Sequence, residues 1–115
     1  MLITRADSNG RRSRAVVHNS TVYLAGQVAD DHSAPIEAQT EQALAKVDDM
    51  LARCGSDRAK ILSAIIWLKS MNDYSAMNKV WDHWVDPDHA PARACVTGDM
   101  AYPDILVEIM VVAAA

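Results

Sequence analysis

Two apolar segments near the end of the chain decide its fold: Pro91-Ala92-Arg93-Ala94-Cys95-Val96 and, after a short polar break, Ile105-Leu106-Val107-Glu108-Ile109-Met110-Val111-Val112. Both segments are predicted strands, and each is apolar apart from one charged residue, Arg93 in the first and Glu108 in the second. A charge inside an apolar strand is costly unless it is paired or used. We therefore interpret the rest of the chain as the scaffold that positions these two charges.

The chain before these strands alternates between strand and helix patterns. Asn19-Ser20 joins two short strand-like runs and is typical of a tight hairpin turn, because Asn tolerates positive φ. The length and β-branched content of residues 61–68 favour a buried strand over a helix. The predicted strands are 1–5, 14–18, 21–25, 61–68, 91–96 and 105–112, and the predicted helices are 35–54 and one that is capped by Asn72 or Asp73 and stopped by Pro87 and Pro91.

Residues typical of helix ends flank the first predicted helix. Pro35 is tolerated in a first turn, and Gly55 stands where a C′ glycine belongs. Apolar residues recur at steps of three and four, which predicts one buried stripe. The stripe consists of Ile36, Thr40, Ala43, Leu44, Val47, Met50, Leu51 and Cys54, and the apolar face of the second helix consists of Tyr74, Met77, Trp81, Trp84 and Val85.

The order ββ-α-β-α-ββ predicts an α+β fold in one domain over residues 1–115, a single mixed β-sheet with two helices on one face. The strands 61–68 and 105–112 are nevertheless apolar on both faces, apart from Ser63 and Glu108. Strands of this kind are buried on both sides, and an uncovered apolar face would be adhesive. We therefore expect a homo-oligomer in which another copy of the chain covers the second face.

The charge of the chain excludes two classes of partner. A net charge of −4 and a pI near 5.4 argue against a general nucleic-acid or anionic-membrane binder. Arg11, Arg12 and Arg14 form a local basic cluster, which we interpret as the solvated end of a strand.

The sequence also predicts the compartment. Residues 1–7 lack the apolar core of a secretory signal, and the apolar stretch 105–115 is about half a membrane span and is broken by Glu108. Cys54 and Cys95 have no C-x-x-C spacing, which is typical of free thiols in a reducing cytoplasm. A cytoplasmic location is expected.

Three residues of the terminal strands are candidates for chemistry. The guanidinium of Arg93 can hold a carboxylate bidentately, or it can form a structural ion pair. Glu108 can act as a general acid or base through water, and if the two strands are neighbours it can instead pair with Arg93 for stability alone. Cys95 shares the strand face of Arg93, and we favour a pocket-lining role over a nucleophilic one because no neighbour in sequence would activate the thiol.

Several other kinds of site have no support in the sequence. The histidines are His18, His32, His83 and His89, without the spacing of a metal site. Walker A, G-x-G-x-x-G and G-x-S-x-G motifs are absent, which removes nucleotide-loop and serine-hydrolase interpretations.

Five segments together resemble the Rid family of reactive intermediate deaminases, also called the YjgF-like or L-PSP translation-inhibitor family. No single segment is specific, but their order and spacing are. They are Val22-Tyr23-Leu24-Ala25-Gly26-Gln27-Val28, Glu37-Ala38-Gln39-Thr40-Glu41-Gln42-Ala43-Leu44, Tyr74-Ser75-Ala76-Met77-Asn78-Lys79-Val80-Trp81, Ala90-Pro91-Ala92-Arg93-Ala94-Cys95-Val96 and Ile105-Leu106-Val107-Glu108-Ile109.

The resemblance implies a chorismate-mutase-like fold and a homotrimer with clefts between its subunits. It also implies hydrolysis of enamine and imine intermediates, such as 2-aminoacrylate, to a 2-keto acid and ammonia without a cofactor or metal. By similarity, Arg93 holds the substrate carboxylate and Glu108 positions or activates the attacking water. Gly26 and Cys95 line the cleft, and Asn78 matches a residue near it in some members.

Two departures from the family pattern place the chain in a divergent branch. Arg11-Arg12-Ser13 stands where the best-characterised deaminases have Pro-Tyr-Ser, so Arg12 replaces a pocket tyrosine. Ala25-Gly26-Gln27 stands where they have Ser-Gly-Gln, so Ala25 lacks a pocket hydroxyl. These residues support an alternative function, a non-catalytic module that binds a small carboxylate or keto acid. An RNA-cleaving or translation-inhibiting function ranks last, because the chain is acidic and has no paired-histidine site.

Overall fold

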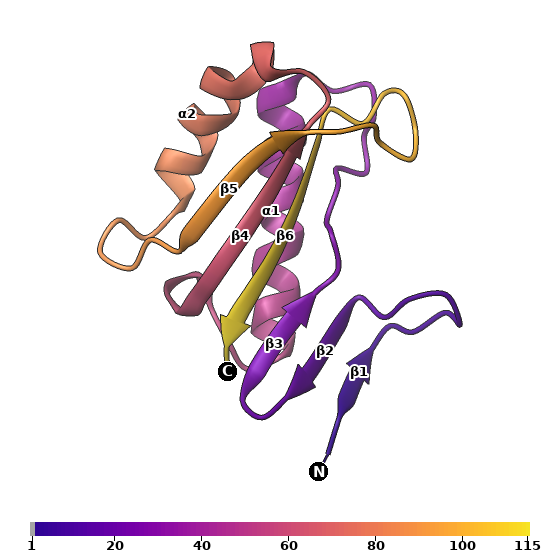
Figure 1. The fold of residues 1–115 in the computed structure, drawn as a ribbon, viewed down its shortest axis with the longest axis vertical. Coiled ribbons are helices and arrows are strands. Elements are labelled where there is room, and N and C mark those ends of the chain that lie inside the picture. Colours follow the sequence, from indigo (N-terminus) through magenta and orange to yellow (C-terminus); the bar gives the residue numbers. More distant parts are fainter. Residues whose placement is uncertain (1) are drawn as a thin grey trace.

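Six strands form one mixed sheet in a computed structural model of the chain, which describes residues 2–115 (Figure 1). The strand order across the sheet is β1-β2-β3-β6-β4-β5, and only the β4–β5 pair is parallel. The strands are β1 (Thr4–Ala6), β2 (Ala15–His18), β3 (Thr21–Leu24), β4 (Ile61–Leu68), β5 (Ala92–Thr97) and β6 (Val107–Ala114), and the helices are α1 (Ile36–Arg53) and α2 (Tyr74–Trp84). The predicted fold class is confirmed.

The predicted elements agree with the observed ones except at their ends. The first strand is Thr4–Ala6 rather than 1–5, and Met1 lies outside the described residues. The last strand begins two residues later than predicted and continues to Ala114, where it pairs with Thr21 of β3. Asn19 and Ser20 adopt φ values of 51° and 60°, so both residues of the predicted hairpin turn are left-handed.

Helix α1 ends as its sequence predicts. The backbone N–H of Cys54 donates to the Met50 and Leu51 carbonyls, and Gly55 follows with φ 77°. This left-handed glycine lets the chain turn back so that the Ser56 N–H also reaches the Leu51 carbonyl at 2.8 Å. The apolar stripe is confirmed as the buried face, except that Cys54 is only half-buried.

Gln39 is a buried polar residue of α1 that the stripe did not include. Its Nε2 donates to the carbonyls of Ala34 and Asp104 at 3.0 Å and of His32 at 3.3 Å, and its Oε1 accepts from the Leu106 N–H at 2.9 Å. A single fully buried amide thus joins the connection before α1 to the connection before β6.

We expect Gln39→Leu to lower the free energy of unfolding by about 2–4 kcal/mol, because it leaves a buried N–H and buried carbonyls without partners. Gln42→Leu is the matched control on the same helix, since Gln42 accepts one exposed bond from the Asp31 N–H. Urea unfolding of both variants measures the difference. Equal stabilities would contradict the assigned role of Gln39.

Helix α2 begins differently from the prediction. A short 3-10 turn, Met71–Asp73, precedes it, and the side chain of Ser70 caps this turn by accepting from the Asn72 N–H at 3.1 Å. Asp73 occupies the N-cap position of α2 but its side chain makes no capping bond, so capping by Asn72 or Asp73 was a wrong prediction. Met77 and Trp81 are buried as expected, whereas Tyr74 is 40% exposed and does not belong to the buried face.

The two faces of the sheet are covered unequally. Figure 1 shows α1 behind β4 and β6, with α2 on the same side. In β6 the residues that face the helices are buried and alternate with half-buried ones. The helix-covered residues of β6 are Val107, Ile109, Val111 and Ala113, and the open-face residues are Glu108, Met110, Val112 and Ala114.

The open face remains apolar in the single chain. Tyr23 is 47% exposed and Val96 43% exposed, while Ile65, Trp67 and Met110 between them are only half-buried. The strands β4 and β6 are therefore apolar on both sides, as predicted, but only one side is covered by the chain's own helices. A patch of this kind is typical of a protein interface.

Candidate functional site

The two terminal strands are not neighbours. β4 lies between β5 and β6, pairing in parallel with the first and antiparallel with the second. An Arg93–Glu108 pair was expected only if the terminal strands were neighbours, and this condition is not met. The strands β4 and β6 thus lie side by side inside the sheet, and β5 is an edge strand.

Arg93 and Glu108 lie on opposite faces of the sheet. Arg93 is paired with Ala64, which is buried beneath the helices, so Arg93 points to the helix-covered face. Glu108 is paired with Trp67 and alternates with the buried Val107 and Ile109, so it points to the open face. Directly paired residues share a face, and therefore these two charges cannot meet within one chain.

Gly26 lies directly against Glu108. An isolated bridge between Gln27 and Ile109, with hydrogen bonds of 2.8 and 3.0 Å, holds the segment after β3 alongside β6. A Cβ added at Gly26 would overlap Glu108 Oε2 and lie 2.8 Å from Glu108 Cδ. The observed position of the carboxylate therefore requires a glycine here, because any other residue would place a Cβ against it.

We expect Gly26→Ala to fold normally but to displace the Glu108 carboxylate, because the clash is with the flexible end of a side chain rather than with backbone. Catalysis that depends on this carboxylate should fall about tenfold or more in kcat, with the melting temperature nearly unchanged. The control is Gly98→Ala, whose added Cβ would meet only the Trp67 ring at 3.3 Å. Unchanged kcat in Gly26→Ala would contradict the role of Glu108.

The guanidinium of Arg93 has an aromatic partner and no acidic one. Its Cζ lies 5.2 Å from the centroid of the Trp81 ring, and within residues 2–115 it forms no ion pair with a carboxylate. The structural ion pair considered from the sequence is therefore not formed inside the chain. The hydrogen-bond donors of Arg93 are available to a ligand.

Cys95 lies beside Arg93 on the same face and packs against the core. Burial raises the pKa of the Cys95 thiol, and this effect outweighs the opposing one of the nearby Arg93 charge. Cys54 is the other free cysteine, and burial raises the pKa of its thiol too. A thiol with a raised pKa is protonated at neutral pH, which favours the lining role over the nucleophilic one.

We expect Cys95→Ala to keep kcat within about threefold of the unmodified protein, since a protonated thiol is a poor nucleophile. Alkylation of Cys95 by iodoacetamide, measured in a Cys54→Ala background, should be slow at pH 7 and accelerate towards pH 9 and above. A complete loss of turnover in Cys95→Ala, or fast alkylation at pH 6, would contradict this assignment.

The other predicted site residues are dispersed. Asn78 lies on α2, and its Oδ1 is buried without a hydrogen-bond partner in the part of the chain that is described, as expected of an atom that awaits a ligand or a second subunit. Ala25 precedes Gly26, and its carbonyl accepts from Gln27 Nε2 at 2.8 Å. Arg12 is exposed in the β1–β2 connection, where its guanidinium donates to the Asp7 carbonyl at 2.9 Å.

The candidate residues therefore form two groups on one chain. Gly26, Ala25 and Glu108 lie together along β6, while Arg93 and Cys95 lie under α2, the helix that carries Asn78. In residues 2–115 no cluster of His, Cys, Asp and Glu is arranged to bind a metal ion. Neither helix of this part of the chain is long and apolar enough to cross a membrane.

A mixed six-stranded sheet with both helices on one face, and with Arg93 and Glu108 on opposite faces, defines an α+β protein. The family model described as Endoribonuclease L-PSP matches residues 3–115. The chain therefore belongs to the L-PSP family, which is also described as YjgF-like or Rid.

Individual relatives cover the chain almost completely. It is 43% identical over 114 residues to the RutC family protein YoaB of Escherichia coli strain K12, with 99% of each chain covered. It is also 42% identical to a RutC family protein of Haemophilus ducreyi, covering 98% of this chain and 97% of that one. The crystal structure of a YjgF family member from Neisseria meningitidis superposes with a TM-score of 0.96 at 42% identity, covering 99% and 95% of the two chains.

Proposed function

We propose that the protein is a cofactor-independent hydrolase that converts 2-imino acids, and the enamines from which they arise, to 2-keto acids and ammonia. The observation that carries this proposal is the state of Arg93, a half-buried guanidinium held against an aromatic ring with no carboxylate partner in the described chain. A 2-imino acid supplies a carboxylate of the right geometry for a bidentate interaction.

The proposed active site lies between two subunits. Arg93 and Glu108 lie on opposite faces of one sheet, so a substrate that contacts both must lie between two copies of the chain. The open apolar face, with Tyr23 and Val96 exposed, is the surface that a second copy would cover. We propose a homotrimer, the cyclic assembly that the family resemblance implies, in which each subunit gives Arg93 to one cleft and Glu108 to the next.

The proposed reaction needs only positioning and proton transfer. Arg93 holds the substrate carboxylate, with Cys95 and Asn78 beside it, while Gly26 and Ala25 let the Glu108 carboxylate approach from the facing subunit. Glu108 accepts a proton from a water molecule while the oxygen of that water attacks the imine carbon. The C=N bond becomes a C–N single bond. That proton then passes to the nitrogen, which gives an intermediate with a hydroxyl and an amino group on one carbon. Glu108 next moves the hydroxyl proton to the nitrogen, the C–N bond breaks, and ammonia leaves as the C=O bond of the keto acid forms.

The test is an imine-hydrolysis assay. An amino-acid oxidase generates 2-imino acids from several amino acids while semicarbazide competes for the imine, and keto acid and ammonia are measured. We expect the protein to accelerate keto-acid formation and to suppress the semicarbazone. No acceleration on any imine by the folded oligomer would contradict the proposal.

A binding module is the second candidate. It is favoured by Ala25, which supplies no hydroxyl beside Glu108, and by Arg12, which adds a positive charge on an exposed loop. A binder of this kind would melt at a higher temperature with a 2-keto acid yet release no ammonia. Both functions fit a cytoplasmic protein with two free thiols.

A further inference from the structure

Trp81 is the only side chain of the described chain that holds the Arg93 guanidinium by a cation–π contact. Its ring is 5% exposed and lies between α2 and the sheet, and Arg93 Cζ is 5.2 Å from its centroid. A cation over a shielded aromatic face is attracted more strongly than one in water. The Arg93 side chain on the edge strand β5 is therefore held against the Trp81 ring rather than left free to move.

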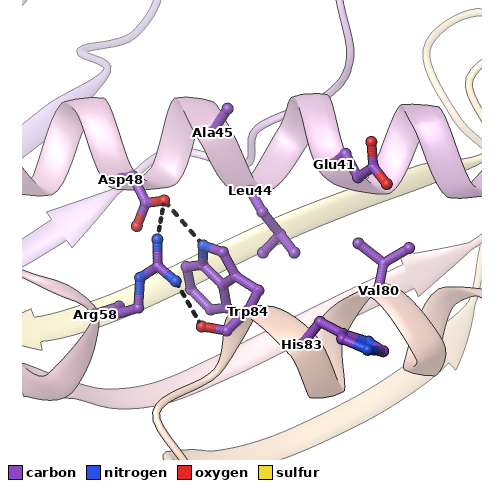
Figure 2. Close-up of a pocket in the computed structure, with 8 residues that line it drawn as sticks. All are labelled: Glu41, Leu44, Ala45, Asp48, Arg58, Val80, His83 and Trp84. Carbon is purple, nitrogen blue, oxygen red and sulfur yellow. Dashed lines mark hydrogen bonds and ion pairs between the residues drawn. The ribbon is translucent and has the colours of Figure 1, made fainter.

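The Trp81 ring is itself in contact with a second ring, that of Trp84, which is fixed to α1. Trp84 packs against Trp81 with ring centroids 5.2 Å apart and an interplanar angle of 49°. Its indole Nε1 donates to Asp48 Oδ2 at 3.0 Å, so the second ring is tied to α1 (Figure 2).

Arg58, in the 3-10 turn before β4, also holds Trp84 in place. One guanidinium nitrogen donates to Asp48 Oδ2 and another to the Trp84 carbonyl, both at 2.8 Å (Figure 2). The same guanidinium lies over the Trp84 ring at 5.1 Å. Trp84, the ring that packs against Trp81, is thus held by a hydrogen bond, a backbone contact and a cation.

An aromatic partner leaves the hydrogen-bond donors of a guanidinium free, whereas an acidic partner uses them. A carboxylate would occupy the N–H edge of a guanidinium with hydrogen bonds, whereas a ring contacts its flat face and leaves the in-plane donors unused. Burial next to an aspartate or glutamate would hold Arg93 equally well but would compete with a ligand carboxylate. The Trp81 contact avoids this competition.

We propose that Trp81 is a positioning residue. Its cation–π contact holds the Arg93 guanidinium in place and leaves the N–H donor edge of that group preordered for a substrate carboxylate. The inference rests on the proposed function, because the donor edge matters only if Arg93 anchors the ligand. Its energetic effect is to reduce the side-chain ordering that binding requires, so it should appear in substrate affinity more than in the chemical step.

The test compares Trp81→Phe with Trp81→Leu in the full-length oligomer. Trp81→Phe keeps an aromatic face and should raise KM for 2-imino acids by less than about threefold, whereas Trp81→Leu removes it and should raise KM about tenfold with kcat changed much less. Met77→Ala is the control, since Met77 is buried on the same helix but the cation–π contact to Arg93 comes from Trp81, and its KM should stay near that of the unmodified protein.

A second readout does not depend on catalysis. In a 1H–15N spectrum, the Arg93 Nε–H signal, assigned by its loss in Arg93→Lys, should be displaced upfield by the ring current of Trp81. Trp81→Leu should return it to the ordinary arginine position. A protein that fails the hydrolysis assay yet shows this displacement would refute the proposed function and keep the positioning role.

Two results would overturn the inference. One is an undisplaced Arg93 signal in the unmodified protein, which would mean that the contact between Arg93 and Trp81 is not populated in solution. The other is the same KM in Trp81→Leu as in Trp81→Phe, which would mean that the ring acts only as packing.

Discussion

Arg93→Ala is expected to abolish the acceleration of imine hydrolysis, with a loss of kcat/KM on the order of a hundredfold or more. The guanidinium supplies the charge that is proposed to hold the substrate carboxylate, and a charge-assisted bidentate interaction is among the strongest that a side chain makes. The fold should persist, because Arg93 lies half-buried on the edge strand β5 and forms no ion pair within residues 2–115.

Arg93→Lys is the matched control for charge. It keeps the positive charge but loses the planar fork, so an intermediate loss of about tenfold or more is expected. Initial rates of keto-acid formation, with circular dichroism and size-exclusion chromatography as checks of fold and assembly, measure both variants. Full activity in Arg93→Ala would show that the substrate carboxylate is held elsewhere.

Mixing two inactive variants is expected to restore activity. Arg93→Ala and Glu108→Gln each lack one half of every proposed site, and the two halves lie on opposite faces of one sheet. In a cyclic trimer that contains both variants, one cleft receives an intact Arg93 from one subunit and an intact Glu108 from its neighbour. Random assembly at equal amounts should therefore regenerate about a quarter of the sites.

The experiment requires exchange of subunits, so the variants are co-expressed or refolded together and compared with the same proteins mixed without unfolding. The control mixture pairs Arg93→Ala with the double variant Arg93→Ala/Glu108→Gln, which cannot rebuild a site. No recovery in verified mixed oligomers would contradict the placement of the site between subunits and require both groups to act from one chain.

Loss of Arg93 and loss of the Glu108 carboxylate should affect different kinetic parameters. Removing Arg93 takes away binding that the ground state and the transition state share, in addition to orientation, and should raise KM. Removing the carboxylate of Glu108 takes away proton transfer, and should lower kcat at nearly constant KM. Gly26→Ala should resemble the second variant in a milder form, because it moves the carboxylate rather than deleting it.

Local patterns in the sequence were sufficient for the secondary structure. The three- and four-residue apolar period of residues 36–51, with Gly55 after it, predicted α1, and Asn19-Ser20 predicted a turn with positive φ. The boundaries of β4 were predicted without error. The capping of α2 was not, because the side chain that caps its approach is Ser70, which precedes a 3-10 turn that has no distinct signal in the sequence.

Gln39 shows why the polar part of the core was harder to predict. In the sequence it is one glutamine on a helix rich in polar residues, and its neighbour by spacing, Gln42, is half-buried with a single bond. The bonds that give Gln39 its role join it to Asp104 and Leu106, more than sixty residues away. No local pattern contains such contacts.

The sequence by itself determined which residues are strands and helices, which strands are apolar on both sides, and that Arg93 and Glu108 are the isolated charges of the terminal strands. These properties depend on periodicity within a segment, which neighbouring residues set. Only the tertiary structure decided that β4 separates β5 from β6, that the two charges face opposite sides, that Gly26 touches Glu108 and that Trp81 supports Arg93. Strand pairing and face are set by contacts between distant segments, which the order of residues within a single segment does not specify.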